Sequence, residues 1–262
     1  MNTAQQTRKL LAFRHRLHQF PELSGKEGRT AEMVITFLKE CEPDQLYTAI
    51  GGHGILALWK APTQGPMILF RAELDALPIH DNSGKPYHSR HKGMGHQCGH
   101  DGHMTILAGL ALKLYQGLIK KGSVGLLFQP AEETGMGAAA MLDTGLLQTL
   151  KQDHIFALHN LPGYAANSLV WTSGSFTAAV ISVDMQFEGK KTHAATPELG
   201  ASPALAISQL VHETRMMEVT DPEDDHFLLI TPIQIRLGQP AYGTAPGEGV
   251  LSFTVRCWSN SN

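Results

Sequence analysis

Residues that could bind a metal ion and activate water are concentrated in three short segments of this 262-residue chain. The first segment reads Cys-Gly-His-Asp-Gly-His over residues 98–103. Cys98 and His100, a thiolate and an imidazole two residues apart, suit zinc, and also nickel, cobalt or manganese when carboxylates join them. The alternative is a buried cysteine beside the start of a helix. We expect His103, which lies in the first turn of that helix, to have a supporting role.

The other two segments each follow an apolar run that is typical of a strand. Glu132 and Glu133 come after residues 124–128, and His159 comes after residues 155–158. Adjacent carboxylates on a loop point in different directions, so one can bind a metal while its neighbour takes a proton from water. For Glu132 and Glu133, the alternative is a solvated acidic pair on the surface. For His159, it is a core histidine whose hydrogen bonds are all made within the protein. Their positions favour the metal site, because open α/β sheets bind ligands at the carboxyl ends of their strands.

Asp75 also follows a strand, within Arg-Ala-Glu-Leu-Asp-Ala-Leu-Pro at residues 71–78. A carboxylate in this place could hold a metal-binding imidazole in one tautomer. It could equally cap the turn before Pro78. The residues themselves do not separate these two interpretations.

The elements that must position these residues alternate along the chain. Apolar residues at helical or strand spacing predict both types, and Ser24 with Glu27 has the spacing of a capping box that opens the second helix. Such alternation favours a mostly parallel sheet covered by helices on both faces. The predicted helices cover 3–18, a segment that begins after Ser24, 104–118 and 138–150, and the predicted strands cover 55–59, 67–70, 124–128 and 155–158.

The pattern changes near residue 173. A strand over 179–187 and a helix over 203–218 precede strands over 227–236 and 250–257. This order suggests a small α+β domain with its helix on one face of a sheet. We therefore expect a metal-binding domain over 1–172 and a smaller domain over 173–262.

Composition narrows the possible partners and surroundings. The chain is 42% hydrophobic and 17% charged, with a net charge of −3 and no long basic block, which gives little support for binding nucleic acid or an anionic membrane. Its three widely spaced cysteines indicate no disulfide framework. The first ten residues lack an apolar signal core, and no apolar run approaches the length of a membrane span. We expect a cytoplasmic protein.

Four motifs together resemble the M20 family of metallopeptidases, in particular the amidohydrolase branch that contains hippurate, N-acyl-amino-acid and auxin-conjugate hydrolases. The similarity extends over nearly the whole chain, with further matches at residues 17–24 and 137–145. The four motifs are Arg-Ala-Glu-Leu-Asp-Ala-Leu-Pro-Ile (71–79), Cys-Gly-His-Asp-Gly-His (98–103), Gln-Pro-Ala-Glu-Glu (129–133) and Ala-Leu-His-Asn-Leu-Pro-Gly (157–163).

The resemblance implies a zinc-peptidase-like catalytic domain interrupted by a lid domain that also mediates dimer contacts. It implies two divalent ions (zinc or manganese, with nickel or cobalt possible), a small N-acyl amino acid or peptide substrate, and a homodimer. Glu132 matches the general base, and His193 matches a lid histidine that reaches the substrate. The matching metal ligands are Cys98, His100, Glu133 and His159.

Three departures from the family pattern bear on activity. The family has a further metal-binding histidine in a C-terminal segment, whereas no histidine follows His226 here. The sequence ends shortly after residues 255–259, before the segment that completes the catalytic sheet in relatives. Gly243-Thr244-Ala245-Pro246 stands where the family usually has Asn-Val-Ile-Pro, so an asparagine expected near the substrate is lost.

The first two departures lead us to expect a truncated product, a fragment or a short member. The alternative function is therefore an inactive metal-binding member with a regulatory or binding role. A purely structural zinc site is a third possibility, against which Glu132 speaks, because structural sites are usually closed Cys/His sets.

Overall fold

A computed structural model describes residues 2–259, which form two compact units divided between Tyr164 and Ala165. Our expected boundary lay a little later, after residue 172. The assignment of the first unit as catalytic domain and of the second as lid stays a prediction. Neither unit, as far as it is described, contains a helix long and apolar enough to cross a membrane.

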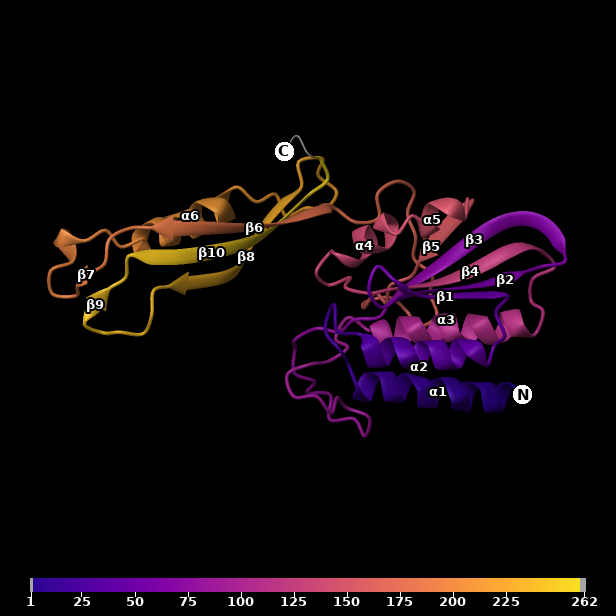
Figure 1. Ribbon diagram of the computed structural model, residues 1–262. Helices are drawn as coiled ribbons and strands as arrows, with labels where there is room; N and C mark the ends of the chain where they lie inside the picture. The colour runs from indigo at the N-terminus through magenta and orange to yellow at the C-terminus, as the bar shows by residue number, and fades with distance from the viewer. Residues whose placement is uncertain (1, 260–262) are drawn as a thin grey trace. The chain divides into compact units, whose positions relative to one another are not determined.

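The first unit alternates helices and strands as the sequence predicted (Figure 1). Its elements are α1 (Thr3–Gln19), α2 (Gly28–Lys39), β1 (Gln45–Ile50), β2 (Gly54–Lys60), β3 (Thr63–Glu73), α3 (His100–Tyr115), β4 (Lys121–Gln129), α4 (Gly137–Asp143), α5 (Leu146–Thr149) and β5 (His154–Ala157).

The sheet of the first unit has the strand order β1-β2-β4-β3-β5. Strand β2 is antiparallel to both of its neighbours, while β4, β3 and β5 pair in parallel. Four of the five strands therefore run in the same direction, which confirms the predicted mostly parallel sheet. Strand β1 was not predicted, because its half-exposed residues give no apolar run.

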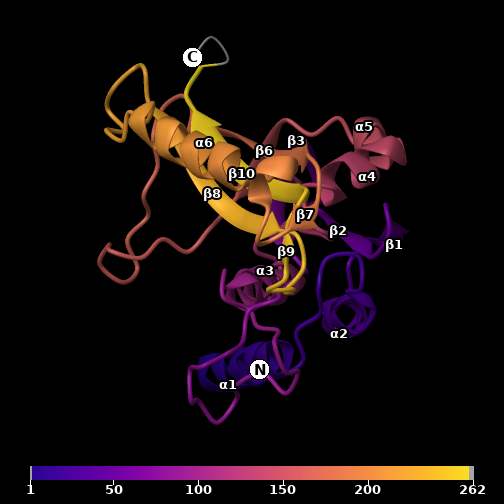
Figure 2. The ribbon, with the colours of Figure 1, turned by 90° about the vertical axis from the view of Figure 1, so that its left-hand side faces the viewer.

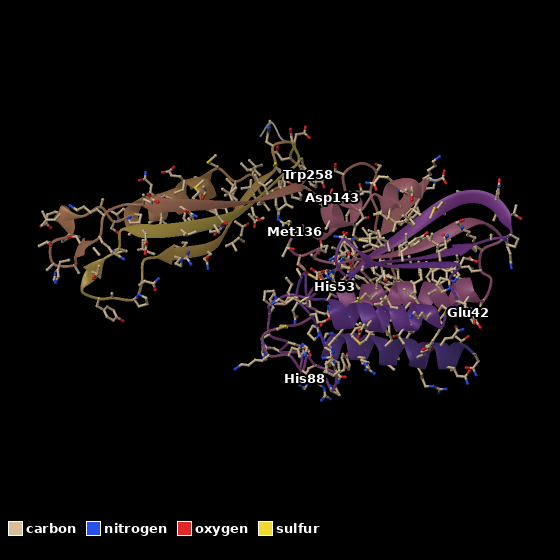
Figure 3. All side chains as sticks on the ribbon, in the orientation of Figure 1. Glu42, His53, His88, Met136, Asp143 and Trp258 are labelled. Carbon is tan, nitrogen blue, oxygen red and sulfur yellow. The ribbon has the colours of Figure 1, made fainter. Side chains whose placement is uncertain are left out.

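Helices cover both faces of this sheet (Figures 1 and 2). On one face α1, α2 and α3 pack over a large apolar cluster that includes Leu17, Ile55 and Phe128, none of them exposed. Burial of side chains of this size contributes about 1.5–3 kcal/mol each. On the other face, Leu56 and Met141 belong to a smaller cluster beneath α4 and α5. Figure 3 shows side chains filling the space between the helices and the sheet.

Two local predictions were wrong. A capping box is present at Asn2 and Gln5, at the start of α1, whereas α2 begins without a side-chain cap. Ser24 instead bonds to Asp75 and Glu27 to Ala131, both far along the chain, and Glu27 also accepts the N–H of nearby Gly25. The predicted helix over 138–150 is two helices, because Gly145 lies between them in the left-handed conformation with φ 74°.

The second unit has the predicted α+β composition. Its elements are β6 (Ala179–Glu188), β7 (Thr192–His193), the 3₁₀ helix η1 (Pro197–Leu199), α6 (Ala204–Met216), β8 (Leu228–Leu237), β9 (Thr244–Ala245) and β10 (Glu248–Cys257). An antiparallel sheet with the order β6-β10-β8 packs against α6 through Ile207, Leu251 and Phe253. Strands β7 and β9 form a separate two-stranded ribbon.

Candidate metal centre

The carboxyl ends of the three parallel strands bring the predicted site residues together. Asp75 follows β3, Glu132 and Glu133 follow β4, and His159 follows β5. Because these strands are neighbours and run in the same direction, the loops after them meet at one edge of the sheet. Cys98 completes the set from the loop before α3.

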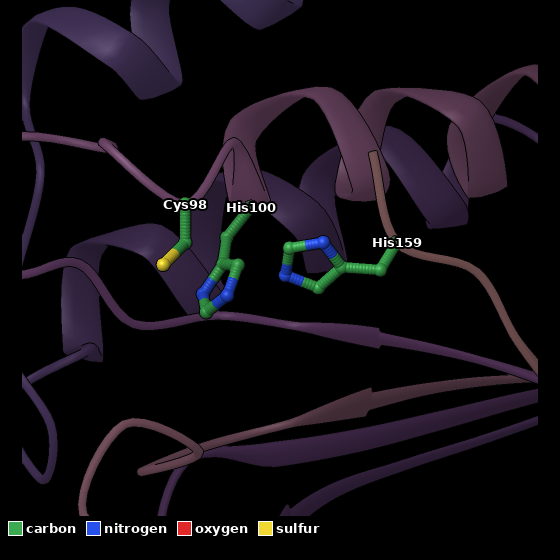
Figure 4. A group of neighbouring side chains, drawn as sticks. All are labelled: Cys98, His100 and His159. Carbon is green, nitrogen blue, oxygen red and sulfur yellow. The ribbon is translucent and has the colours of Figure 1, made fainter. Parts of the chain in front are cut away.

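Three side chains from the predicted ligand set face one another. One possible ligand atom from each of Cys98, His100 and His159 lies within 4.8 Å of the other two. Figure 4 shows Cys98 and His100 at the beginning of α3 and His159 on the segment after β5, with the side chains turned toward each other. His100 belongs to two further such groups, one with Glu73 and His103 and one with Asp75 and Glu132.

His100 is the centre of the arrangement and is only 1% exposed. Its Nδ1 lies 2.8 Å from the main-chain oxygen of Asp75. Donation of the Nδ1 proton to this carbonyl leaves the lone pair on Nε2, which lies 3.7 Å from a carboxylate oxygen of each of Glu132 and Glu133. This edge of the site therefore offers a nitrogen acceptor and two carboxylates to one point.

The charges around His100 favour a cation. Burial lowers the pKa of His100. The hydrogen bond to Asp75 and the negative charges of Glu73 and Asp75 raise this pKa by more than burial lowers it, so the net shift is upward. Burial and the nearby carboxylates, Glu133 first, raise the pKa of the Cys98 thiol to about 12. A thiolate at Cys98 therefore needs the charge of a metal ion beside it.

Several buried atoms of the site have no hydrogen-bond partner. Within the described residues these include His100 Nε2, Glu133 Oε1 and Asp75 Oδ1. Buried polar atoms are nearly always hydrogen-bonded, so unpartnered ones that face one place point to a missing ligand. Imidazole, carboxylate and thiolate donors are those that zinc and related divalent ions take. The residues fit a metal centre.

The two glutamates differ in exposure. The Glu132 side chain is 37% exposed and that of Glu133 is 18% exposed. Burial raises the pKa of Glu132 above its usual value, and the charge of Glu133 adds to the rise, although His100 and Arg71 oppose it. A carboxylate with a raised pKa is a better proton acceptor at neutral pH.

The carboxylate of Asp75 supports the site on two sides. Oδ2 accepts hydrogen bonds from the Ser24 hydroxyl at 2.7 Å and from the Glu133 amide at 2.9 Å. Burial raises the pKa of Asp75, but the neighbouring imidazole of His100 and these two hydrogen bonds lower it to about 2. From the sequence we considered the Asp75 carboxylate as the group that holds the imidazole. The hydrogen bond to His100 Nδ1 is made instead by the main-chain oxygen of Asp75, while Oδ1 lies 3.5 Å from that nitrogen.

Two supporting residues were missed from the sequence. Glu73 accepts a hydrogen bond from Nδ1 of His103 at 2.8 Å, and Asn160 donates its main-chain N–H to Nε2 of His103 at 3.0 Å. Arg71 pairs with Glu73 on its other side. Glu73 ends β3 two residues before Asp75, a spacing that puts side chains of an extended chain on the same side, and this was a signal that could have identified it.

His193 lies in the second unit, apart from the other predicted residues in the chain. It is exposed, stands opposite Thr244 in the β7–β9 ribbon, and accepts the Ala195 N–H on Nδ1 at 3.1 Å. The segment around His193 and the Gly243–Pro246 segment, both singled out in the sequence, thus lie beside each other. The contact of His193 with a substrate stays a prediction.

Comparison with known proteins identifies the family. The model of peptidase family M20/M25/M40 matches residues 69–246, which is more than half of the chain. The chain belongs to this family, and the resemblance seen in its motifs is confirmed.

Curated relatives and a solved structure agree with this assignment. The chain is 35% identical to the N-acetyl-L-cysteine deacetylase of Bacillus subtilis, over 99% of this chain and 62% of that protein. It is 31% identical to the hippurate hydrolase of Campylobacter jejuni, over 94% and 64%. The Bacillus subtilis YXEP protein, described as a dinuclear metal binding peptidase of the M20 family, superposes with a TM-score of 0.73 at 27% identity, over 99% of this chain and 67% of that one. The chain spans less than two thirds of the length of these two curated relatives.

Proposed function

We propose that this chain carries the metal-binding and proton-transfer residues of an amidohydrolase that cleaves the amide bond of small N-acyl amino acids. The observation that supports this most directly is the meeting of Glu132 and Glu133 at Nε2 of His100, beside Cys98 and His159. The names of the two curated relatives describe a deacetylase of N-acetyl-L-cysteine and a hydrolase of hippurate. Both substrates carry an acyl group on an amino-acid nitrogen.

Cys98, His100, Glu133 and His159 would hold two divalent ions. When bound, such ions polarise the substrate carbonyl and lower the pKa of a water molecule to about 7. Glu132 would take the proton of this water and then pass it to the departing amine. Asp75 would keep His100 oriented through the contact at Nδ1.

Several finer assignments belong to this proposal. His193 would contact the substrate from the lid, and the lid would form a homodimer. Zinc or manganese would be the bound metal, with nickel or cobalt as substitutes. A cytoplasmic location is supported by the three cysteines, Cys41, Cys98 and Cys257, each a free thiol.

An inactive regulatory member is not favoured by the comparisons. The matched relatives are named for hydrolytic reactions, and Glu132 stands beside His100 as a proton acceptor should. The same position of Glu132 disfavours a structural zinc site, because structural sites are usually closed Cys/His sets.

The replacement Glu132→Gln tests the proposal. We expect hydrolysis of N-acetyl and N-benzoyl amino acids to fall by about 10²–10⁴-fold, since the proton acceptor is lost, while cobalt binding measured by absorbance is retained. Glu42→Gln, at an exposed glutamate after α2 (Figure 3), is the control and should keep full activity. Full activity of Glu132→Gln would contradict the assignment of the base. A wild-type chain that binds cobalt at these residues but hydrolyses no acyl amino acid would support the regulatory alternative.

A further inference from the structure

The residues after α1 contain a fully buried carboxylate, Glu27, that the proposed mechanism does not use. We propose that Glu27 is a positioning residue that fixes the turn 130–133 and so aims Glu132 and Glu133 at His100. This inference rests on the proposed function, because it assigns Glu27 through the two glutamates that it positions.

The contacts of Glu27 reach the acidic turn directly. Its side chain is 0% exposed, and Oε1 accepts the main-chain N–H of Ala131 at 2.8 Å, across 104 residues of sequence. The same oxygen accepts the N–H of Gly25 at 2.8 Å. Although Glu27 stands at the N-cap position of α2, its side chain makes no capping bond there. The carboxylate therefore serves the turn and not the helix.

The conformation of Ala131 explains why the turn needs a support. Ala131 has φ 46°, in the left-handed region that a residue with a Cβ adopts only when its surroundings impose it. This residue, immediately before Glu132, donates its main-chain N–H to Glu27. A charged acceptor makes a stronger hydrogen bond to an N–H than a neutral one. Loss of Glu27 would let Ala131 relax, and rotation there redirects both glutamates that follow.

A second tie, from Asp75, holds the other end of the turn and is itself supported from the same N-terminal segment. The N–H of Glu133 donates to Asp75 Oδ2 at 2.9 Å, and the Ser24 hydroxyl donates to the same oxygen at 2.7 Å. Glu27 therefore acts directly on one end of the three-residue span Ala131–Glu133. Ser24 acts on the other end through Asp75. This arrangement accounts for a Ser-x-x-Glu pattern that does not form a capping box.

The first measurement is exchange of the Ala131 amide hydrogen, followed by NMR in the metal-free chain. In Glu27→Ala we expect this amide to lose its protection, because its buried acceptor is gone. In Glu27→Gln the side-chain amide oxygen can still accept the bond, so protection should be kept. This readout depends on neither metal nor activity.

The second measurement is the dissociation constant for cobalt. We expect Glu27→Ala to weaken cobalt binding by about 10–100-fold, as losses of groups that orient metal ligands do, and Glu27→Gln to restore most of it. Glu27→Asp, which keeps the charge but is one methylene shorter, provides a second variant should the alanine variant unfold. It should weaken binding as well, because the shorter side chain does not reach Ala131.

Glu22→Ala is the matched control. Glu22 belongs to the same segment, and its carboxylate accepts the N–H and the hydroxyl of Thr30 in α2 at 2.8 and 3.0 Å. Its loss should lower stability and leave cobalt binding and the Ala131 amide unchanged. A general structural role for this segment predicts instead that Glu22→Ala and Glu27→Ala weaken cobalt binding equally, and that result would overturn the proposal, as would a protected Ala131 amide in Glu27→Ala.

Glu133→Ala separates this inference from the proposed function. If Glu133→Ala binds cobalt as tightly as the wild type, the ligand assignment fails. Selective loss of Ala131 protection in Glu27→Ala would then still show that Glu27 positions the turn.

Discussion

The two sides of the candidate metal centre are supported in different ways. The acidic turn, Ala131–Glu133, is tied at both ends by buried carboxylates, Glu27 and Asp75. The segment that carries His159 follows the edge strand β5, whose residues are all exposed. This segment meets the centre through the His159 ring, which lies edge-on to His100 and His103, and through the main-chain bond from Asn160 to His103.

This difference indicates which side of the site is fixed before a metal binds. Two buried carboxylates hold the acidic turn, in which Ala131 has a strained backbone conformation. Such a conformation persists only where the surrounding structure imposes it. The histidine segment rests on hydrogen bonds at an exposed edge, where opening is easier. We therefore expect substitutions beneath the acidic turn to have larger effects than those beneath His159.

The largest expected effect comes from Gly137→Ala, which should displace the acidic turn by a steric clash from a residue outside it. A Cβ at Gly137 would lie 1.6 Å from the main-chain oxygen of Pro130, so the backbone of the turn must move. We expect the free energy of unfolding to fall by about 3 kcal/mol, at the upper end for an over-packed site, together with a loss of cobalt affinity. Urea unfolding and cobalt titration measure the two effects.

Gly135→Ala is the control for this substitution. Gly135 has φ 70° but no atom within 4 Å of a built Cβ, so only backbone strain of about 1–2 kcal/mol is expected. Equal losses in the two variants would show that the close approach at Pro130 is unimportant.

An intermediate effect is expected on the other side, from His103→Ala. This substitution removes the partner of both Glu73 and the Asn160 main chain, and we expect cobalt affinity to fall by about tenfold, the lower limit for a group that orients a ligand. His88→Ala, in the loop between β3 and α3 (Figure 3), is the control, because the His88 ring bonds to the nearby Lys85 carbonyl, within the same loop. A loss larger than that of Glu27→Ala would reverse the comparison.

The smallest effect on the centre itself is expected from a substitution beneath the start of α3, at His18. His18 bridges Asp101 at 3.0 Å and Asp81 at 3.2 Å. The hydrogen bond to Asp101 raises the pKa of His18 against the effect of burial, and the charges of Asp101 and Asp81 add to the rise. Protonated His18 therefore stabilises the folded chain below pH 6.5, and this contribution is lost as the pH rises through the higher pKa of the folded state.

His18→Asn should accordingly lower the free energy of unfolding by more at pH 5.5 than at pH 8.5. Bonds to charged groups of this kind contribute about 1–3 kcal/mol. Urea unfolding at the two pH values measures the difference. An equal loss at both would show that folding does not raise the pKa of His18.

Much of the first unit could be predicted from the sequence because its strands are apolar runs and its ligands follow them. Residues 55–59 and 124–128 are buried strands, and Glu133 and His159 lie where strands end. The supports of the site were harder to predict, because their partners are far apart in sequence. Glu27 meets Ala131 and Ser24 meets Asp75 only after the sheet has formed. Local spacing therefore suggested a capping box where the fold makes two long-range ties.

The unpartnered atoms His100 Nε2, Asp75 Oδ1 and Glu133 Oε1 link the stability of this chain to its chemical surroundings. Each is buried without a hydrogen bond, which costs about 1–3 kcal/mol per group. A cation that these groups bind in the folded state alone adds about 2.7 kcal/mol of stability when its free concentration is 100 times its dissociation constant. The folding equilibrium would then follow the supply of metal, and a chelator would act on the chain as a mild denaturant.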